Sequence, residues 1–322
     1  MKYADFVCDL HGHTNRSDGS DSPAEFLRHA AERRMKIVAI TDHDKILPEK
    51  IQVDAEEVNA EGYAASLGLR LLRGIEISTE TYIDDVHLVC LGCDWSSVYF
   101  QKLEKMVTES KIESYKMLVQ KLKRKGMDLS WEELLFNHGI PIGENDVQKK
   151  MIFNLMAEKG YVKDWSEAKL MVKNDTALSI PRIKPDAVEV IHEIHRQGGI
   201  VIMAHPYLVN DSVYFNESWI SRERFIEHLI FEGLDGIEAR YTYDKTSYGG
   251  TMTKEEIYWE VIQRYQWRIP VISGGSDYHG DRKRGVENPR EIGECGLTES
   301  EFYQNRVLCS LLPEIKMEVC KR

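Results

Sequence analysis

Seven short runs of apolar and β-branched residues recur along the chain, and several are separated by segments with a helical pattern. Strands that alternate with helices predict a mostly parallel β-sheet covered by helices. Nearly every run ends beside a histidine, aspartate or glutamate, at the end of the strands where β/α barrels carry their active sites. The runs are residues 6–10, 37–41, 71–75, 87–91, 200–204, 236–239 and 270–273.

The alternation of strands stops between residues 96 and 183. Helical patterns replace it, and no repeat or low-complexity segment accompanies them. We therefore expect a barrel formed by residues 1–95 and 184–322, with a helical insertion, residues 96–183, that covers the mouth of the barrel.

The composition is that of a water-soluble globular protein, with 42% hydrophobic and 30% charged residues among 322. No stretch approaches the roughly 20 apolar residues of a membrane helix. A signal peptide pattern is absent, and the six cysteines are scattered. We expect a cytoplasmic protein without membrane association. The net charge of −11 argues against a broad surface for duplex nucleic acid, so an anionic substrate would need local positive charge.

The strongest motif follows the first strand run, where His11 and His13 stand two residues apart and Asp18 is close by. An extended segment points both imidazoles to one side. Imidazole nitrogens and carboxylate oxygens are ligands of Zn, Mn and Fe. A single such histidine would more often form only a hydrogen bond, but matching groups follow other strands, and together they exceed the needs of one ion. The predicted ligands are His11, His13, Asp18, His43, Glu76, His87, His205, Asp277 and His279.

Glu76 is the ligand best suited to bridge two ions, because a carboxylate has two oxygens. Without a partner, a buried glutamate would cost several kcal/mol or become protonated. A metal cluster therefore explains its position at a strand end better than a packing role does.

In this order, the ligands resemble the polymerase and histidinol phosphatase (PHP) family of metallophosphoesterases, over residues 5–92 and 198–285. The resemblance implies a distorted (β/α)7 barrel with a helical insertion and three divalent ions, Mn, Fe or Zn. It also implies three ligand sets: His11, His13, Glu76 and Asp277; Glu76, His87 and His205; and Asp18, His43 and His279.

The implied reaction is hydrolysis of a small phosphomonoester or phosphodiester by a hydroxide that bridges two ions, with Glu76, His205 and Asp277 as catalytic residues. Nucleotides, the ends of short single-stranded oligonucleotides and cyclic sugar phosphates are the candidate substrates. An amidohydrolase-type enzyme that cleaves a C–N or carboxylic ester bond is the alternative. A non-catalytic binding module is less favoured, because every ligand position is filled.

Stand-alone members of the family often carry Gly-Arg-Pro-His-x-Ala-Arg shortly before Gly-Tyr-Val. Here residues 160–162 read Gly-Tyr-Val, but residues 148–154 contain neither the arginines nor the histidine. Other cations would have to bind the substrate, since arginine grips phosphate through two N–H groups and lysine acts as a point charge. We predict this role for Arg240, which follows a strand, and for Arg182 and Lys184.

Overall fold

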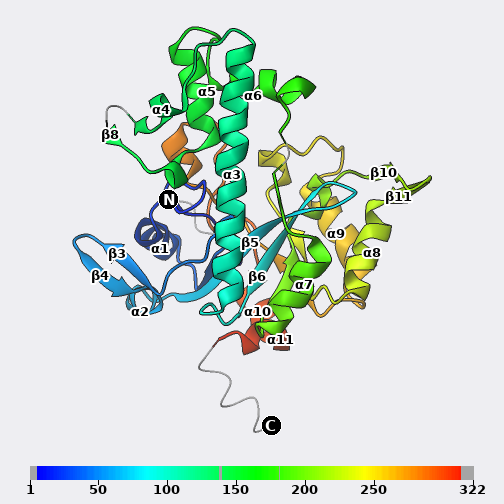
Figure 1. Cartoon of the computed structure of the whole chain (residues 1–322). Helices are drawn as coiled ribbons and strands as arrows, with labels where there is room; N and C mark the ends of the chain where they lie inside the picture. Colours follow the sequence, from blue (N-terminus) through cyan, green and yellow to red (C-terminus); the bar gives the residue numbers. More distant parts are fainter. Residues whose placement is uncertain (1–5, 138–139, 181, 313–322) are drawn as a thin grey trace. The chain divides into compact units, whose positions relative to one another are not determined.

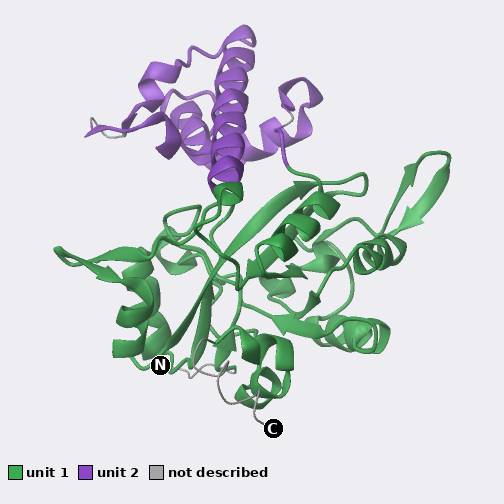
Figure 2. Ribbon diagram, turned by 60° about the horizontal axis from the view of Figure 1, so that its bottom comes forward, with its two compact units in different colours: residues 1–100, 185–322 green, residues 101–184 purple. Residues whose placement is uncertain are grey.

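A computed structural model describes residues 6–137, 140–180 and 182–312. The chain forms two compact units (Figure 2): unit 1 holds residues 1–100 and 185–322, and unit 2 holds residues 101–184. The boundaries expected from the sequence are 95/96 and 183/184. That the insertion covers the barrel mouth stays a prediction.

A seven-stranded sheet forms the centre of unit 1, with the strand order β1-β2-β5-β6-β9-β12-β13 (Figure 1). Neighbouring strands pair in parallel except β6, which is antiparallel to both β5 and β9. Each predicted strand run coincides with one of these strands. Their bounds are β1 Cys8–Asp9, β2 Ile37–Ile40, β5 Arg70–Glu80, β6 Asp85–Leu91, β9 Ile200–Met203, β12 Gly236–Arg240 and β13 Val271–Gly274.

The segments that follow the two outer strands, β1 and β13, bring them together. His13 N donates to Tyr278 O at 2.8 Å, and Asp277 N donates to His11 O at 3.0 Å. Gly12 and Tyr278 form an isolated parallel bridge. The sheet is therefore nearly closed, which confirms the expected distorted barrel.

Helices of unit 1 follow or precede the strands, as expected for a β/α architecture. The first begins where the sequence favours it, because the Ser22 hydroxyl accepts from Glu25 N at 3.3 Å and Glu25 Oε2 accepts from Ser22 N at 2.7 Å. The helices are α1 Pro23–Glu32, α2 Ala60–Ser66, α7 Ala187–Arg196, α8 Arg222–Phe231, α9 Lys254–Tyr265, α10 Glu299–Gln304 and α11 Arg306–Ser310.

Strand β2 shows how the core is divided. Val38 and Ile40 pack with Phe26 of α1 in one apolar cluster, whereas Ile37 and Ala39 belong to a second cluster. Alternate residues of a strand point to opposite faces, so this strand is buried on both sides, which is typical of a strand inside a β/α fold.

Two hairpins in unit 1 have no counterpart among the predicted elements, since their strands are only four residues long and mostly exposed. They are β3 Lys50–Val53 with β4 Glu56–Asn59, and β10 Ser212–Phe215 with β11 Ser218–Ser221. Short 3₁₀ turns of this unit are Pro206–Leu208, Tyr243–Lys245 and Asp281–Arg284.

Unit 2 is mainly helical and has an apolar core of its own, which includes Leu118, Leu122, Ile152 and Met156. Helix α3 starts in unit 1 and continues into unit 2. Among the described residues, no helix combines the length and apolar character that a bilayer span requires. The elements are α3 Val98–Arg124, α4 Trp131–Leu134, β7 Phe136–Asn137, β8 Ile140–Pro141, α5 Lys149–Glu158 and α6 Trp165–Asn174, with 3₁₀ turns Glu144–Asp146 and Thr176–Leu178.

Candidate metal centre

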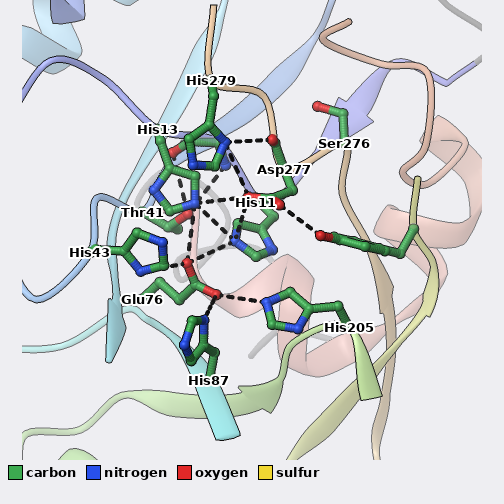
Figure 3. Close-up of polar contacts among 12 residues, drawn as sticks. His11, His13, Thr41, His43, Glu76, His87, His205, Ser276, Asp277 and His279 are labelled. Atoms are coloured by element: carbon green, nitrogen blue, oxygen red, sulfur yellow. Dashed lines mark hydrogen bonds and ion pairs between the residues drawn. The ribbon is translucent and has the colours of Figure 1, made fainter. Parts of the chain in front are cut away.

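The predicted metal ligands all lie in unit 1, and the imidazole and carboxylate groups of those labelled in Figure 3, all except Asp18, point toward one another. Glu76 belongs to β5, and His87 lies near the start of β6. Because β6 runs antiparallel to its neighbours, its amino end lies beside the carboxyl ends of the other strands. The remaining ligands follow β1 (His11, His13, Asp18), β2 (His43), β9 (His205) and β13 (Asp277, His279).

The carboxylate of Glu76 is the centre of this cluster and is fully buried. Its Oε1 lies 3.0 Å from His87 Nδ1 and 3.1 Å from His205 Nε2. Its other oxygen, Oε2, faces a second group of imidazoles. The distances from Oε2 are 3.0 Å to His43 Nδ1, 3.1 Å to His13 Nε2 and 3.2 Å to His11 Nε2. The two oxygens therefore face separate sets of histidines, as expected for a bridging ligand.

Two aspartates complete the cluster. Asp277 Oδ1 lies 3.0 Å from His13 Nε2 and 3.5 Å from His11 Nε2. Asp18 Oδ1 lies 3.0 Å from His279 Nε2. Three groups result whose potential ligand atoms lie within 4.8 Å of one another: His11, His13, Glu76 and Asp277; His43, Glu76 and His87; and His13, Asp18, His43 and His279.

The hydrogen-bond geometry of these groups fits metal ligands. Glu76 Oε2, although it has three imidazole nitrogens within 3.2 Å, accepts no hydrogen bond in the described part of the chain. The Nδ1 atoms of His13 and His205 are likewise buried without a partner. Leaving buried polar atoms unpaired costs about 1–3 kcal/mol each. Carboxylate oxygens and imidazole nitrogens that point at one another without hydrogen bonds between them are suited to bind divalent cations. The residues of this cluster therefore fit such ions.

The electrostatics of the cluster also favour bound positive charge. Burial alone raises the pKa of the Glu76 carboxyl, but the charges of His43, His11 and His87 outweigh it and hold this pKa well below its usual range. Burial lowers the pKa of His13, yet the neighbouring carboxylates of Asp277 and Glu76 reverse the shift and raise it to about 10. For His43, burial prevails and lowers the pKa to about 3. The carboxyl of Glu76 is therefore stabilised in its ionised form by positive charge close to it.

Glu238 of β12, which the sequence analysis missed, supports two ligands from behind. Its buried Oε1 lies 2.9 Å from His11 Nδ1, and its Oε2 accepts from His205 N at 2.7 Å. The first contact leaves His11 Nε2 to face the cluster. The second holds His205 in a left-handed conformation, φ 31° and ψ 57°, which a non-glycine residue adopts only at a cost. Its buried position on a predicted strand was the only signal available in the sequence.

Tyr241 and Arg290, which the sequence analysis also missed, hold Asp277 in place. Its Oδ2 accepts from Tyr241 Oη at 2.7 Å and from Arg290 Nη1 at 2.6 Å. The same guanidinium bonds to Asp281 at 2.8 Å through Nε. With Oδ2 occupied in this way, Oδ1 is the oxygen directed at His11 and His13.

A tight loop, residues 14–21, carries Asp18. Asp42 Oδ1 accepts from Thr14 N and from Ser17 Oγ, both at 2.7 Å, and its Oδ2 accepts from Thr14 Oγ1 at 2.7 Å. A Cβ at Gly19 would lie 2.6 Å from His13 O, so only glycine fits there. The buried Asp42 therefore fixes the loop and, through it, Asp18.

A model of the PHP domain matches residues 9–174, half of the chain. The chain belongs to the PHP family. The family predicted from the ligand order is confirmed.

Several relatives of this PHP chain have been characterised. The 5′-3′ exoribonuclease Rnm of Salmonella typhimurium is 24% identical over 85% of both chains. The phosphoribosyl 1,2-cyclic phosphate 1,2-diphosphodiesterase of Eggerthella lenta is 24% identical over 84% of this chain and 94% of its own. Among solved structures, a proposed metal-dependent phosphoesterase from Bifidobacterium adolescentis has a TM-score of 0.68 at 23% identity, covering 96% of this chain and 97% of its own, and therefore shares the fold.

The structure of this PHP barrel gives Arg240 partners other than the metal cluster. Its guanidinium forms two hydrogen bonds to the Glu301 carboxylate, at 2.7 and 3.1 Å, and another to Tyr258 Oη at 3.0 Å. A β-bulge between Glu238 and Arg240 explains the difference, because an extra residue redirects the side chains that follow it. The structure thus shows Arg240 in an ion pair with Glu301, and the predicted contact of Arg240 with substrate stays a prediction.

The other two predicted substrate contacts, Arg182 and Lys184, lie in unit 2. Nothing in unit 1 bears on them, so their role stays a prediction.

Proposed function

We propose that the barrel binds three divalent ions, Mn, Fe or Zn, and hydrolyses a phosphomonoester or phosphodiester of a nucleotide, a short oligonucleotide end or a cyclic sugar phosphate. At the level of reaction class, the predicted metal-dependent phosphoric ester hydrolase agrees with the PHP family and with relatives named as an exoribonuclease and a cyclic phosphate diphosphodiesterase. The observation that carries the proposal is the contact of Glu76 with histidines on both of its oxygens.

In this proposal, the ligand sets are those expected from the sequence, with Glu76 shared between two of them. His87 and His205 would hold one ion together with Glu76 Oε1, and His11, His13 and Asp277 would hold its neighbour with Oε2. Such ions, when bound, acidify water and neutralise charge on the phosphoryl oxygens. Asp18, His43 and His279 would hold the third ion.

The chain's own residues set the direction of approach and the positions of the reacting groups. The side chains of Asp18, His43 and His87 are 52%, 26% and 23% exposed, whereas those of His11, His13 and Glu76 are inaccessible. The substrate therefore reaches the cluster from the Asp18, His43 and His87 side. We assign the buried Glu76, His205 and Asp277 as catalytic residues, because each of them would hold at least one of the first two ions.

The test is a substrate panel for protein loaded with Mn, Fe or Zn: p-nitrophenyl phosphate, bis(p-nitrophenyl) phosphate, nucleoside bisphosphates, 5′-phosphorylated oligoribonucleotides and cyclic sugar phosphates. We expect phosphate release or diester cleavage with at least one of them. Glu76→Ala should lower the bound metal and reduce turnover by more than about 100-fold. Glu80→Ala, which removes an exposed carboxylate from the same strand, is the matched control. Full metal loading without turnover of any phosphoester, or turnover of amides and lactones alone, would overturn the proposal.

A further inference from the structure

Two helices of unit 1, α8 and α9, carry an aromatic surface that faces solvent. Trp267, two residues after the end of α9, and Phe231, the last residue of α8, are 89% and 86% exposed. No other large apolar side chain in the described part of the chain is as exposed as these two. Trp259 of α9 is also exposed. Single surface aromatics are ordinary, whereas a contiguous group of them marks a contact surface.

The three aromatic side chains belong to one continuous surface. Trp259 and Trp267 stand eight positions apart, and the chain stays in helix or turn through residue 268, so both project from one side of this segment. Arg268 Nη1 donates to Glu227 Oε1 at 2.6 Å, which joins the segment to α8. Phe231 follows Glu227 by one helical turn on the same side of α8. The two helices lie side by side in Figure 1.

The charges along α9 and the turn after it are ordered by sign. The charged residues of this surface are, in chain order, Glu255, Glu256, Glu260, Arg264 and Arg268. Lys254, the remaining charged residue of α9, lies 3.5 Å from Asp244. Glu260 pairs with Arg264 at 2.9 Å, but Glu255 and Glu256 have no cation partner among the described residues. The surface is therefore acidic at the start of α9 and basic beyond its end.

Such a surface is complementary to a copy of itself that runs in the opposite direction. In a two-fold contact the two α9 helices would be antiparallel, so the acidic end of each would meet the basic end of the other. With Gln263 at the axis, Trp259 would face Trp267 of the second copy, and Glu255 would lie within one helical turn of its Arg268. Nucleic acid and anionic lipid are poorer occupants, because the unpaired glutamates would repel them.

We propose that the chain forms a two-fold symmetric homodimer through this α8–α9 surface, with the two α9 helices antiparallel. The aromatic side chains supply enough area for it. A buried aromatic contributes about 150–250 Å², so three from each copy supply roughly 1,000 Å² of the about 1,200–2,000 Å² that a specific interface buries. The inference is independent of the proposed function, since none of these residues is a predicted metal ligand.

The first experiment is sedimentation velocity of the full chain at concentrations from about 1 to 100 µM. The wild type should form a dimer at the upper concentrations. Trp267→Ser should raise the dimer dissociation constant at least about 30-fold, the effect of losing an aromatic residue at the centre of an interface. Trp219→Ser, which removes an exposed tryptophan from hairpin β10–β11, is the matched control and should dimerise like the wild type.

A charge exchange tests the antiparallel arrangement. Glu255→Lys and Arg268→Glu should each dimerise poorly alone, because the homodimers place like charges against each other. An equimolar mixture should associate, since a dimer with one copy of each variant has opposite charges at both contacts. Circular dichroism checks that every variant is folded.

A wild-type chain that stays monomeric at about 100 µM would overturn the inference. A dimer that Trp267→Ser leaves unchanged, or that Trp219→Ser weakens equally, would also overturn it. So would a mixture of the two charge variants that associates no better than either variant alone. A monomeric chain that binds vesicles of phosphatidylcholine and phosphatidylglycerol through Trp267 would assign the surface to a membrane instead.

Discussion

Replacing Glu238 by glutamine tests whether its hydrogen bonds to His11 and His205 hold these two ligands in place. Glu238 is 1% exposed, and each of its carboxylate oxygens contacts a different group. One oxygen lies 2.9 Å from His11 Nδ1, and the other accepts from His205 N at 2.7 Å. Glutamine has the same size but only one acceptor oxygen, so its NH₂ group must face one of these N–H donors. The variant therefore loses one charge-assisted hydrogen bond and places two donors against each other.

The magnitude follows from the number of contacts. A hydrogen bond to a charged group contributes about 1.5–3 kcal/mol. The lost hydrogen bond no longer orients His11 or His205 toward the metal. If its full free energy appears in metal binding, the affinity falls about 10- to 100-fold, since each 1.4 kcal/mol is a factor of ten in affinity. In other proteins, mutation of a residue that hydrogen-bonds a metal ligand lowers metal affinity or activity by a similar factor. The backbone conformation of His205 adds to the sensitivity, because its N–H bond to Glu238 restrains a strained residue.

The assay is competition for Mn²⁺ between the protein and a chromophoric chelator, with turnover measured at low and saturating metal. Glu238→Gln should bind Mn²⁺ more weakly and recover part of its turnover at saturating metal. Glu255→Gln, an exposed carboxylate of α9, should behave like the wild type. A correctly folded Glu238→Gln with wild-type Mn²⁺ affinity and wild-type thermal stability would refute this role for Glu238.

Two further outcomes are expected. Arg290→Ala removes a partly buried cation from Asp277 and Asp281 and should lower the free energy of unfolding by about 3 kcal/mol, measured by urea denaturation. Arg290→Lys should restore part of this free energy, and wild-type stability in the alanine variant would contradict the assignment. Chelation of bound metal should lower the melting temperature, because Glu76 then remains buried without its ions, and Mn²⁺ at 100 times its Kd should restore about 2.7 kcal/mol. A melting temperature that responds to neither EDTA nor Mn²⁺ would argue against a metal centre in the barrel.

Much of the barrel could be predicted from local patterns. The apolar runs correspond to the seven strands, and the ligand types after them point to metal binding, because strand periodicity and ligand chemistry both belong to short segments. The hairpin of β3 and β4 was missed because its strands are mostly exposed and polar. The hairpin of β10 and β11 was missed because its strands are short and none of their residues is buried. The bulge in β12 was missed because no residue in that strand signals it.

The sequence by itself determined which residues have the chemistry to bind metal and which strands carry them, because both depend on neighbours along the chain. Only the tertiary structure decided which groups support those ligands and which acid pairs with Arg240. Glu238 contacts His11 across 227 positions, and Arg240 finds its partner 61 positions away in Glu301. Such pairs depend on distances that arise only when the barrel closes, so the fold alone brings Glu238 and Arg290 to the predicted ligands and pairs Arg240 with Glu301.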